Sequence, residues 1–131
     1  MIGLDTNILV RYLTLDDPAQ FRQAAQILER HLTEDDPGFV SLVTIAEMVW
    51  VLRSSYDFTN EQVAAAVRRM LRVPALQIQN AREVFFAAEA LRKGEASFDD
   101  ALIGALGAWA GCTTTFTFDR KAARLKDFKL A

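Results

Sequence analysis

The sequence predicts a single α/β domain, residues 1–131, in which a mostly parallel sheet carries helices on both faces. Strand signals and helix signals alternate along the chain, and this order is typical of parallel sheets. Hydrophobic residues make up 51% and charged residues 24%, an ordinary globular composition with no linker or internal repeat. In sheets of this kind ligands bind beyond the carboxyl ends of the strands, so functional residues are expected there.

The N-terminal segment contains a strand and two helices. Residues 2–4 form a short apolar strand that ends at Asp5 and leads into the helical run NILVRYL. Asp17 followed by Pro18 is typical of a capped helix with proline in its first turn. Apolar residues at helical spacing extend this helix to about His31.

Two more helices are expected in the middle of the chain. Ser41 follows a short FVS strand and can cap an apolar helix that contains Glu47. Thr59 with Gln62 forms a capping-box pattern for the next helix, which ends at about Arg72.

The second half continues the alternation. The helix at 98–110 is apolar on nearly all sides after its acidic start, so we expect it to be buried. In chain order we expect a strand at 75–79, a helix capped by Asn80 with Glu83 and ended by Gly94, the helix at 98–110, a strand at 113–118, a short basic helix and a last edge strand at DFKL.

Charge and cysteine content narrow the functional classes. The net charge of −2 and the pI of about 5.4 argue against a globally basic nucleic-acid surface, although the C-terminal segment has a local basic cluster. Cys112 is the only cysteine, so no internal disulfide forms, and we expect it to be a small buried hydrophobe. We expect no signal peptide at the MIGLDTN start, and no apolar run is long enough to cross a membrane. We therefore expect a cytoplasmic protein.

Five acidic residues lie beside apolar sequence. Asp5 and Asp119 follow strands, Asp99 and Asp100 lie in the first turn of the helix at 98–110, and Glu47 lies within an otherwise apolar helix. If both strands are central and parallel, Asp5 and Asp119 reach the same crevice. Each acid also has a structural explanation: helix capping, interaction with the helix dipole, or a solvated helix stripe.

As a group, these acids indicate a metal site. Carboxylates held close together repel one another unless a cation is present, and hard Mg²⁺ or Mn²⁺ prefers oxygen ligands. One histidine and one cysteine exclude the usual zinc sites. No glycine-rich phosphate loop is present.

Four segments carry a resemblance to a known family. LDTNILVRYL, TIAEMVWVL, SFDDALI and TFTFDRKAARL closely resemble the acidic motifs of PIN-domain ribonucleases, and most of all those of VapC-type toxins of bacterial toxin–antitoxin pairs. The resemblance extends to about Leu125. It implies a three-layer α/β/α sandwich, RNA cleavage with Mg²⁺ or Mn²⁺, a homodimer, and an antitoxin partner whose segment enters the active-site groove.

The same resemblance assigns roles to individual acids. It implies that Asp5, Glu47, Asp100 and Asp119 are the family acids, and that Asp99 is a supporting neighbour. We expect the three aspartates of this set to anchor metal and Glu47 to bind a second ion or to orient the attacking water. Attack by metal-bound hydroxide on phosphorus then yields 5′-phosphate and 3′-hydroxyl ends.

Other positions support the site or depart from the family pattern. Asn7 and Thr117 match polar positions that usually support the metal site, whereas Ser97 stands where family members often carry another acid. Basic residues near the last acid are expected to hold the RNA backbone; these are Arg120, Lys121 and Arg124.

Two other functions are compatible with parts of the sequence. One is a PIN-like module that binds RNA or protein without cleaving it, against which the presence of all four acids argues. The other is a phosphatase of the DxD type, but the first strand ends in Asp5-Thr6-Asn7 and lacks the second aspartate.

Overall fold

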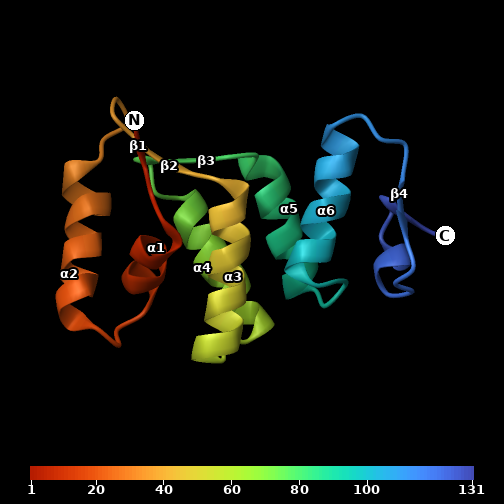
Figure 1. Ribbon diagram of the computed structural model, residues 1–131, viewed down its shortest axis with the longest axis horizontal. Helices are drawn as coiled ribbons and strands as arrows, with labels where there is room; N and C mark the ends of the chain where they lie inside the picture. The colour runs from red at the N-terminus through yellow and green to blue at the C-terminus, as the bar shows by residue number, and fades with distance from the viewer.

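A computed structural model describes all residues 1–131 (Figure 1). Helices and strands alternate along the chain, as the sequence predicts. The elements in order are β1 (Ile2–Gly3), α1 (Thr6–Leu13), α2 (Pro18–Gln26) with a π turn η1 (Ile27–His31), β2 (Gly38–Val40), α3 (Leu42–Tyr56), α4 (Asn60–Leu71), β3 (Leu76–Ile78), α5 (Ala81–Arg92), α6 (Phe98–Trp109), β4 (Thr115–Thr117), a 3₁₀ turn η2 (Ala122–Arg124) and β5 (Phe128–Leu130).

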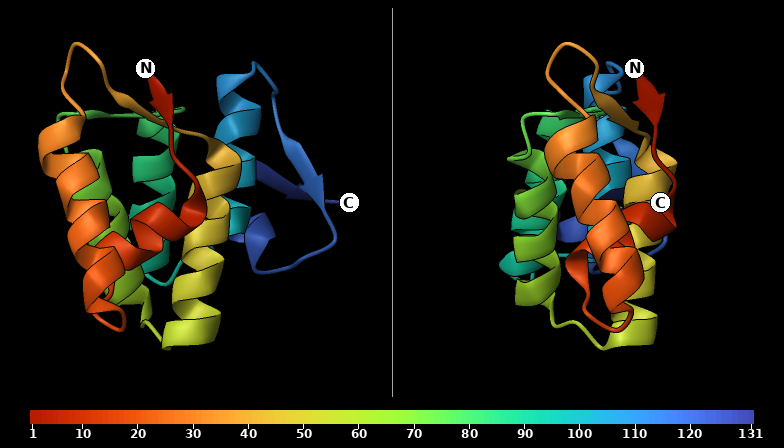
Figure 2. Two further views of the ribbon diagram at one scale, coloured as in Figure 1. Left: turned by 60° about the vertical axis from the view of Figure 1, so that its left-hand side comes forward. Right: turned by 90° about the vertical axis from the view of Figure 1, so that its left-hand side faces the viewer.

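All strand pairs are parallel, which confirms that part of the prediction, but the strands form two separate sheets. One sheet has the order β1-β2-β3, and the other consists of β4 and β5. Figure 1 shows β4 at the opposite end of the molecule from β1, with α5 and α6 between them, and the second view agrees (Figure 2). We call the segment that carries the second sheet, residues 111–131, the C-terminal unit.

Side-chain caps start the helices where the sequence predicts them. The Asp17 side chain accepts a hydrogen bond from the Gln20 backbone N–H, and the Ser41 side chain accepts one from Thr44. At the start of α4 both hydrogen bonds of the Thr59 capping box are present. Each cap satisfies backbone donors that the first helical turn leaves without a partner.

The start of α5 differs from the expected cap. Asn80 adopts a left-handed backbone conformation with φ of 50° and makes no side-chain cap. Its side-chain amide instead donates to the Glu83 carboxylate at 3.0 Å. A left-handed residue cannot present its side chain to the following N–H groups as an extended capping residue does. The predicted end of α5 is confirmed, because Gly94 follows the helix with φ of +72°.

The core lies between α1, α3, α4 and α5. Ile45, Met48 and Leu52 form the fully buried face of α3, and Val63 and Val67 of α4 belong to the same cluster. The opposite face of α3 is exposed. No helix in the structure combines the length and the apolar character needed to span a membrane.

Two expectations for the region around α6 are wrong. Ile103 and Trp109 are 54% and 66% exposed, so α6 is buried on only part of its surface. Cys112 is exposed in the loop after the helix and not buried. Both follow from the position of α6, which separates the main core from the small C-terminal unit and lacks a second covering layer there (Figure 1).

Glycines let the C-terminal unit pack closely on α6. A Cβ atom at Gly104 would lie 2.5 Å from Cε2 of Phe128, and one at Gly107 would lie 2.7 Å from Oγ1 of Thr115. Residues three apart lie on one face of a helix, so these glycines form the surface on which β4 and β5 rest. Phe128 is 9% exposed as a result.

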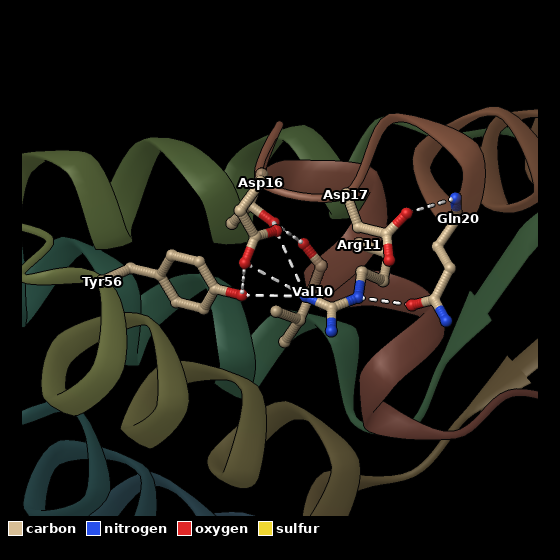
Figure 3. A network of polar contacts seen from close by, with 7 residues as sticks. Val10, Arg11, Asp16, Asp17, Gln20 and Tyr56 are labelled. Carbon is tan, nitrogen blue, oxygen red and sulfur yellow. Dashed lines mark hydrogen bonds and ion pairs between the residues drawn. The ribbon is translucent and has the colours of Figure 1, made fainter.

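A polar network joins the end of α1 to the end of α3 (Figure 3). Arg11 donates to Asp16 at 3.1 Å and to the Tyr56 hydroxyl at 3.0 Å, and Tyr56 donates to Asp16 at 2.7 Å. The Tyr56 hydrogen bond holds the pKa of Asp16 below its ordinary value of 3.8, and the Thr14 hydroxyl and the Arg11 charge lower the pKa further. The network therefore favours the ionised carboxylate.

Removal of the Tyr56 hydroxyl is expected to raise the pKa of Asp16. The ionised carboxylate stabilises the folded chain above the pKa of the unfolded state, and this contribution is lost as the pH falls through the lower folded pKa. In Tyr56→Phe the loss begins at a higher pH. An NMR titration of the Asp16 carboxyl carbon measures the shift, and Tyr12→Phe, which removes a hydroxyl bonded to Glu29, is the control. An unchanged Asp16 titration in Tyr56→Phe would contradict the assignment.

Candidate functional site

Asp5 lies two residues beyond the end of β1 and begins α1. Its Oδ1 accepts a hydrogen bond from the Thr6 backbone N–H at 2.7 Å, so the carboxylate caps the helix. The side chain remains exposed. Asn7, in the first turn of the same helix, is also exposed and makes no side-chain hydrogen bond. Capping uses one carboxylate oxygen of Asp5 and leaves the other free to bind a ligand.

Asp119 lies two residues beyond the end of β4. Its Oδ1 accepts hydrogen bonds from the backbone N–H groups of Lys121 at 2.8 Å and Ala122 at 3.1 Å. Its own N–H donates to Oγ1 of Thr117 at 3.0 Å. Thr117 thus fixes the backbone that presents Asp119, and its role at a metal site stays a prediction. Oδ2 of Asp119 makes no hydrogen bond within the chain.

Asp99 and Asp100 lie in the first turn of α6, as predicted. The Ser97 side chain accepts a hydrogen bond from the Asp100 backbone N–H at 3.2 Å and caps the helix. Asp99 is exposed and Asp100 is half-buried. Ser97 therefore has a structural role as the cap of α6.

Glu47 lies on the exposed face of α3. Its neighbours on that face are Val43 and Trp50, which are 76% and 67% exposed, and Glu47 forms no hydrogen bond or ion pair. Contact with water explains why a carboxylate is tolerated within such an apolar helix. Val43 and Glu47 are both exposed on this face, whereas Thr44 is half-buried.

The structure does not gather these acids within one chain. No group of three or more histidine, cysteine, aspartate or glutamate side chains is arranged to hold a metal ion. The expected convergence required β1 and β4 to be central strands of one sheet, and they are edge strands of two sheets. The carboxylates fit a hard divalent cation in their chemistry, but their arrangement in the single chain does not fit one.

A cleft beside α6 was not predicted from the sequence. It measures about 990 Å³ and lies between α5, α6 and the C-terminal unit. Two of the predicted RNA contacts, Lys121 and Arg124, line it, and Phe86 and Trp109 contribute aromatic surface. The guanidinium carbon of Arg82 lies 5.4 Å from the centre of the Phe86 ring. Arg120 is exposed outside this cleft.

The cleft contains charges of both signs. Arg92 donates to Glu89 at 2.8 Å and Arg68 donates to it at 3.4 Å. The Arg92 hydrogen bond, with the charges of Arg92 and Arg68, holds the pKa of Glu89 below its ordinary value. The i, i+3 spacing of Glu89 and Arg92 indicates this pair in the sequence, whereas the contact with Arg68 depends on the packing of α4 against α5.

Comparison with known proteins identifies the family. No curated protein matches the chain at a significant level. The family model for the PIN domain matches residues 2–127, which include β1 to β4 and all four predicted acids. The helices and parallel strands agree with the predicted three-layer α/β/α class. The chain therefore belongs to the PIN domain family.

Proposed function

We propose that the protein is a metal-dependent endoribonuclease that hydrolyses phosphodiester bonds of RNA in the cytoplasm. The observation that carries this proposal is the PIN domain match over residues 2–127 in a chain that retains an acid at each of the four motif positions. PIN domains are generally nucleases that act on RNA. A domain that only binds RNA gains nothing from four carboxylates, since they repel phosphate.

The proposed roles follow from the chemistry of the side chains. Asp5, Asp100 and Asp119 are the candidates to hold Mg²⁺ or Mn²⁺, and Glu47 is the candidate to place water. A divalent ion would supply positive charge to offset that of the phosphodiester. Thr117 supports Asp119 through its backbone, and the free carboxylate oxygens of Asp5 and Asp119 are available for ligands.

Removal of divalent metal is expected to abolish RNA cleavage. The purified chain should cut single-stranded RNA with Mg²⁺ or Mn²⁺, lose activity in excess EDTA and regain it when metal is restored. Product ends should be 5′-phosphate and 3′-hydroxyl. A chain that binds RNA in a gel-shift assay but cuts none of a panel of RNAs with either metal would instead support the non-cleaving alternative.

Glu47→Gln is expected to reduce cleavage by roughly 10²-fold, the lower range for loss of a group that handles a proton. The substitution keeps the size and exposure of the side chain, so the melting temperature should stay unchanged. Initial rates at saturating Mg²⁺ measure the effect. Glu61→Gln, an exposed acid in the first turn of α4, is the control. Wild-type cleavage by Glu47→Gln would remove Glu47 from the site.

We further propose that this nuclease is the toxin of a toxin–antitoxin pair. The support is the combination of the four motifs and the amount of exposed apolar surface, which includes Val43, Trp50 and Trp109. The neighbouring gene should encode a small DNA-binding protein with an amphipathic tail. Co-expression of the two proteins should restore growth and suppress RNA cleavage. Growth arrest that persists in the presence of the neighbouring protein would argue against that pairing.

A further inference from the structure

The strand β1 has one unpaired edge. It pairs only with β2. The backbone N–H groups of Ile2 and Leu4 donate to the carbonyl oxygens of Pro37 and Phe39, so they face β2. Successive residues of a strand direct their backbone groups to opposite edges in a parallel ladder. The N–H and C=O of Gly3 therefore face the free edge, and no atom lies within 4 Å of the position of a Cβ at Gly3.

The strand β4 has a matching free edge. The Thr115 N–H donates to the backbone oxygen of Asp127, just before β5, and the Thr117 oxygen accepts from the Ala131 N–H, just after it. The N–H and C=O of Phe116 therefore face away from β5. The strands in both sheets run parallel to their neighbours, so β4 can pair with β1 as a further parallel strand.

Apolar side chains are exposed at both edges. Phe116 and Phe118 are 68% and 89% exposed, and Met1 and Ile2 are 67% and 38% exposed. An unprotected apolar strand edge promotes pairing with another strand. Neither edge carries a lysine, a proline or a bulge that would oppose such pairing.

The packing of α6 keeps the two edges of one chain apart. Gly104 and Gly107 hold the C-terminal unit on the side of α6 that faces away from β1, and both views show α6 between the two strands (Figures 1 and 2). A second copy of the chain can place its β4 beside the free edge of β1, while each C-terminal unit stays packed on its own α6.

The exposed area is sufficient for a dimer. The chain has a solvent-accessible surface of 7820 Å², whereas a compact monomer of 14.7 kDa exposes about 6,900 Å². The difference of roughly 900 Å² is close to the area that each partner buries in an interface of standard size, about 800 Å².

We propose that two copies exchange their C-terminal units, so that β4 of each copy pairs with β1 of the other. Each half of the dimer then has one parallel sheet in the order β3-β2-β1 of one copy followed by β4-β5 of its partner. Such an exchange is reciprocal and closed, as twofold symmetry requires.

The exchange also brings two of the predicted acids together, and this part rests on the proposed function. Asp5 lies two residues beyond β1 and Asp119 two residues beyond β4. Carboxyl ends of neighbouring parallel strands meet at one edge of a sheet. Asp5 of one copy and Asp119 of the other therefore lie beside each other in the dimer, although they lie apart in the single chain.

The first test measures molecular mass and does not depend on activity. Light scattering in reducing buffer, which prevents a disulfide through exposed Cys112, should give twice 14.7 kDa at micromolar concentration. Phe116→Pro should give a monomer, because proline lacks the N–H that faces the free edge while the bonds from Thr115 and to Thr117 remain. Phe116→Thr keeps that N–H and should remain dimeric.

Circular dichroism must show the same helical signal in both variants. A wild-type chain that is monomeric at this concentration, or a dimer that persists in Phe116→Pro, would overturn the proposal. Both outcomes would leave the proposed nuclease activity unaffected.

The second test uses complementation between two inactive chains. Asp5→Asn and Asp119→Asn are refolded together in equal amounts. Half of the dimers then combine the two chains, and exchange gives each of these one site with both native aspartates. The mixture should therefore recover roughly a quarter of the wild-type cleavage rate in a twofold-symmetric dimer, while each variant refolded alone stays inactive.

A dimer that lacks exchange never brings Asp5 of one chain beside Asp119 of the other, so no mixture would regain activity. An active wild-type protein whose variants fail to complement would thus overturn the exchange and leave the nuclease function standing. An inactive wild-type protein that forms a Phe116→Pro-sensitive dimer would overturn the function alone.

Discussion

Asp119→Asn is expected to lower RNA cleavage by about 100-fold or more, because loss of a residue that only supports a metal ligand already costs about 10- to 100-fold, and to leave the fold intact. Asparagine keeps the side-chain oxygen that accepts from Lys121 and Ala122, so the turn after β4 survives. It removes a negative charge that strengthens the binding of a divalent cation. Cleavage rates over a range of Mg²⁺ concentrations, together with melting temperature, measure the two effects separately.

Asp127→Asn is the matched control for this substitution. Asp127 lies in the same C-terminal unit, and only its backbone oxygen takes part in β-sheet pairing. Its rate of cleavage should stay within about twofold of wild type, because the Asp127 side chain makes no hydrogen bond or ion pair within the chain and the substitution keeps its size. If Asp119→Asn cut RNA as fast as Asp127→Asn, the last acid of the motif set would have no part in the chemistry.

Leu52→Ala is expected to lower the free energy of unfolding by about 2–5 kcal/mol, the range for removal of a large buried side chain. Leu52 is fully buried on the inner face of α3 and belongs to the main core cluster. Domains of this size are stable by only about 5–15 kcal/mol, so the variant loses a large share of its stability. Urea unfolding followed by circular dichroism should show a lower midpoint with an unchanged slope.

Val43→Ala tests whether position within α3 decides the effect. Val43 lies in the same helix and is 76% exposed, so the expected change is within about 0.5 kcal/mol. Equal losses in Val43→Ala and Leu52→Ala would mean that the outer face of α3 is covered in solution. A concentration-dependent loss at Val43 would then indicate an interface on that face.

Local signals in the sequence were sufficient for most elements. The caps at Asp17, Ser41 and Thr59 act within three residues of themselves, so their hydrogen bonds follow from the residue types alone. The same short range explains why Asp5 and Asp119 were predicted as possible helix-start residues as well as site residues, and their hydrogen bonds show the capping role. Asn80 was the exception, because a left-handed backbone is decided by the chain around it.

Burial of α6 and Cys112 could not be predicted in the same way. Apolar sequence shows that a face can be buried but not whether another element covers it. Ile103 and Trp109 are exposed because nothing in the single chain packs on that part of α6. The cleft beside α6 depends on the same arrangement, since its lining comes from segments far apart in the chain.

The sequence by itself determined the parallel α/β class, the positions of the helices and the placement of an acid just beyond β1 and β4. Only the tertiary structure decided that β1 and β4 are edges of separate sheets, and hence that their carboxylates do not meet within one chain. Helix caps and periodicity depend on residues a few positions apart, whereas the pairing of strands more than 100 residues apart depends on which surfaces are free to meet. In this protein the C-terminal unit packs on Gly104 and Gly107 of α6, and this packing keeps β4 away from β1.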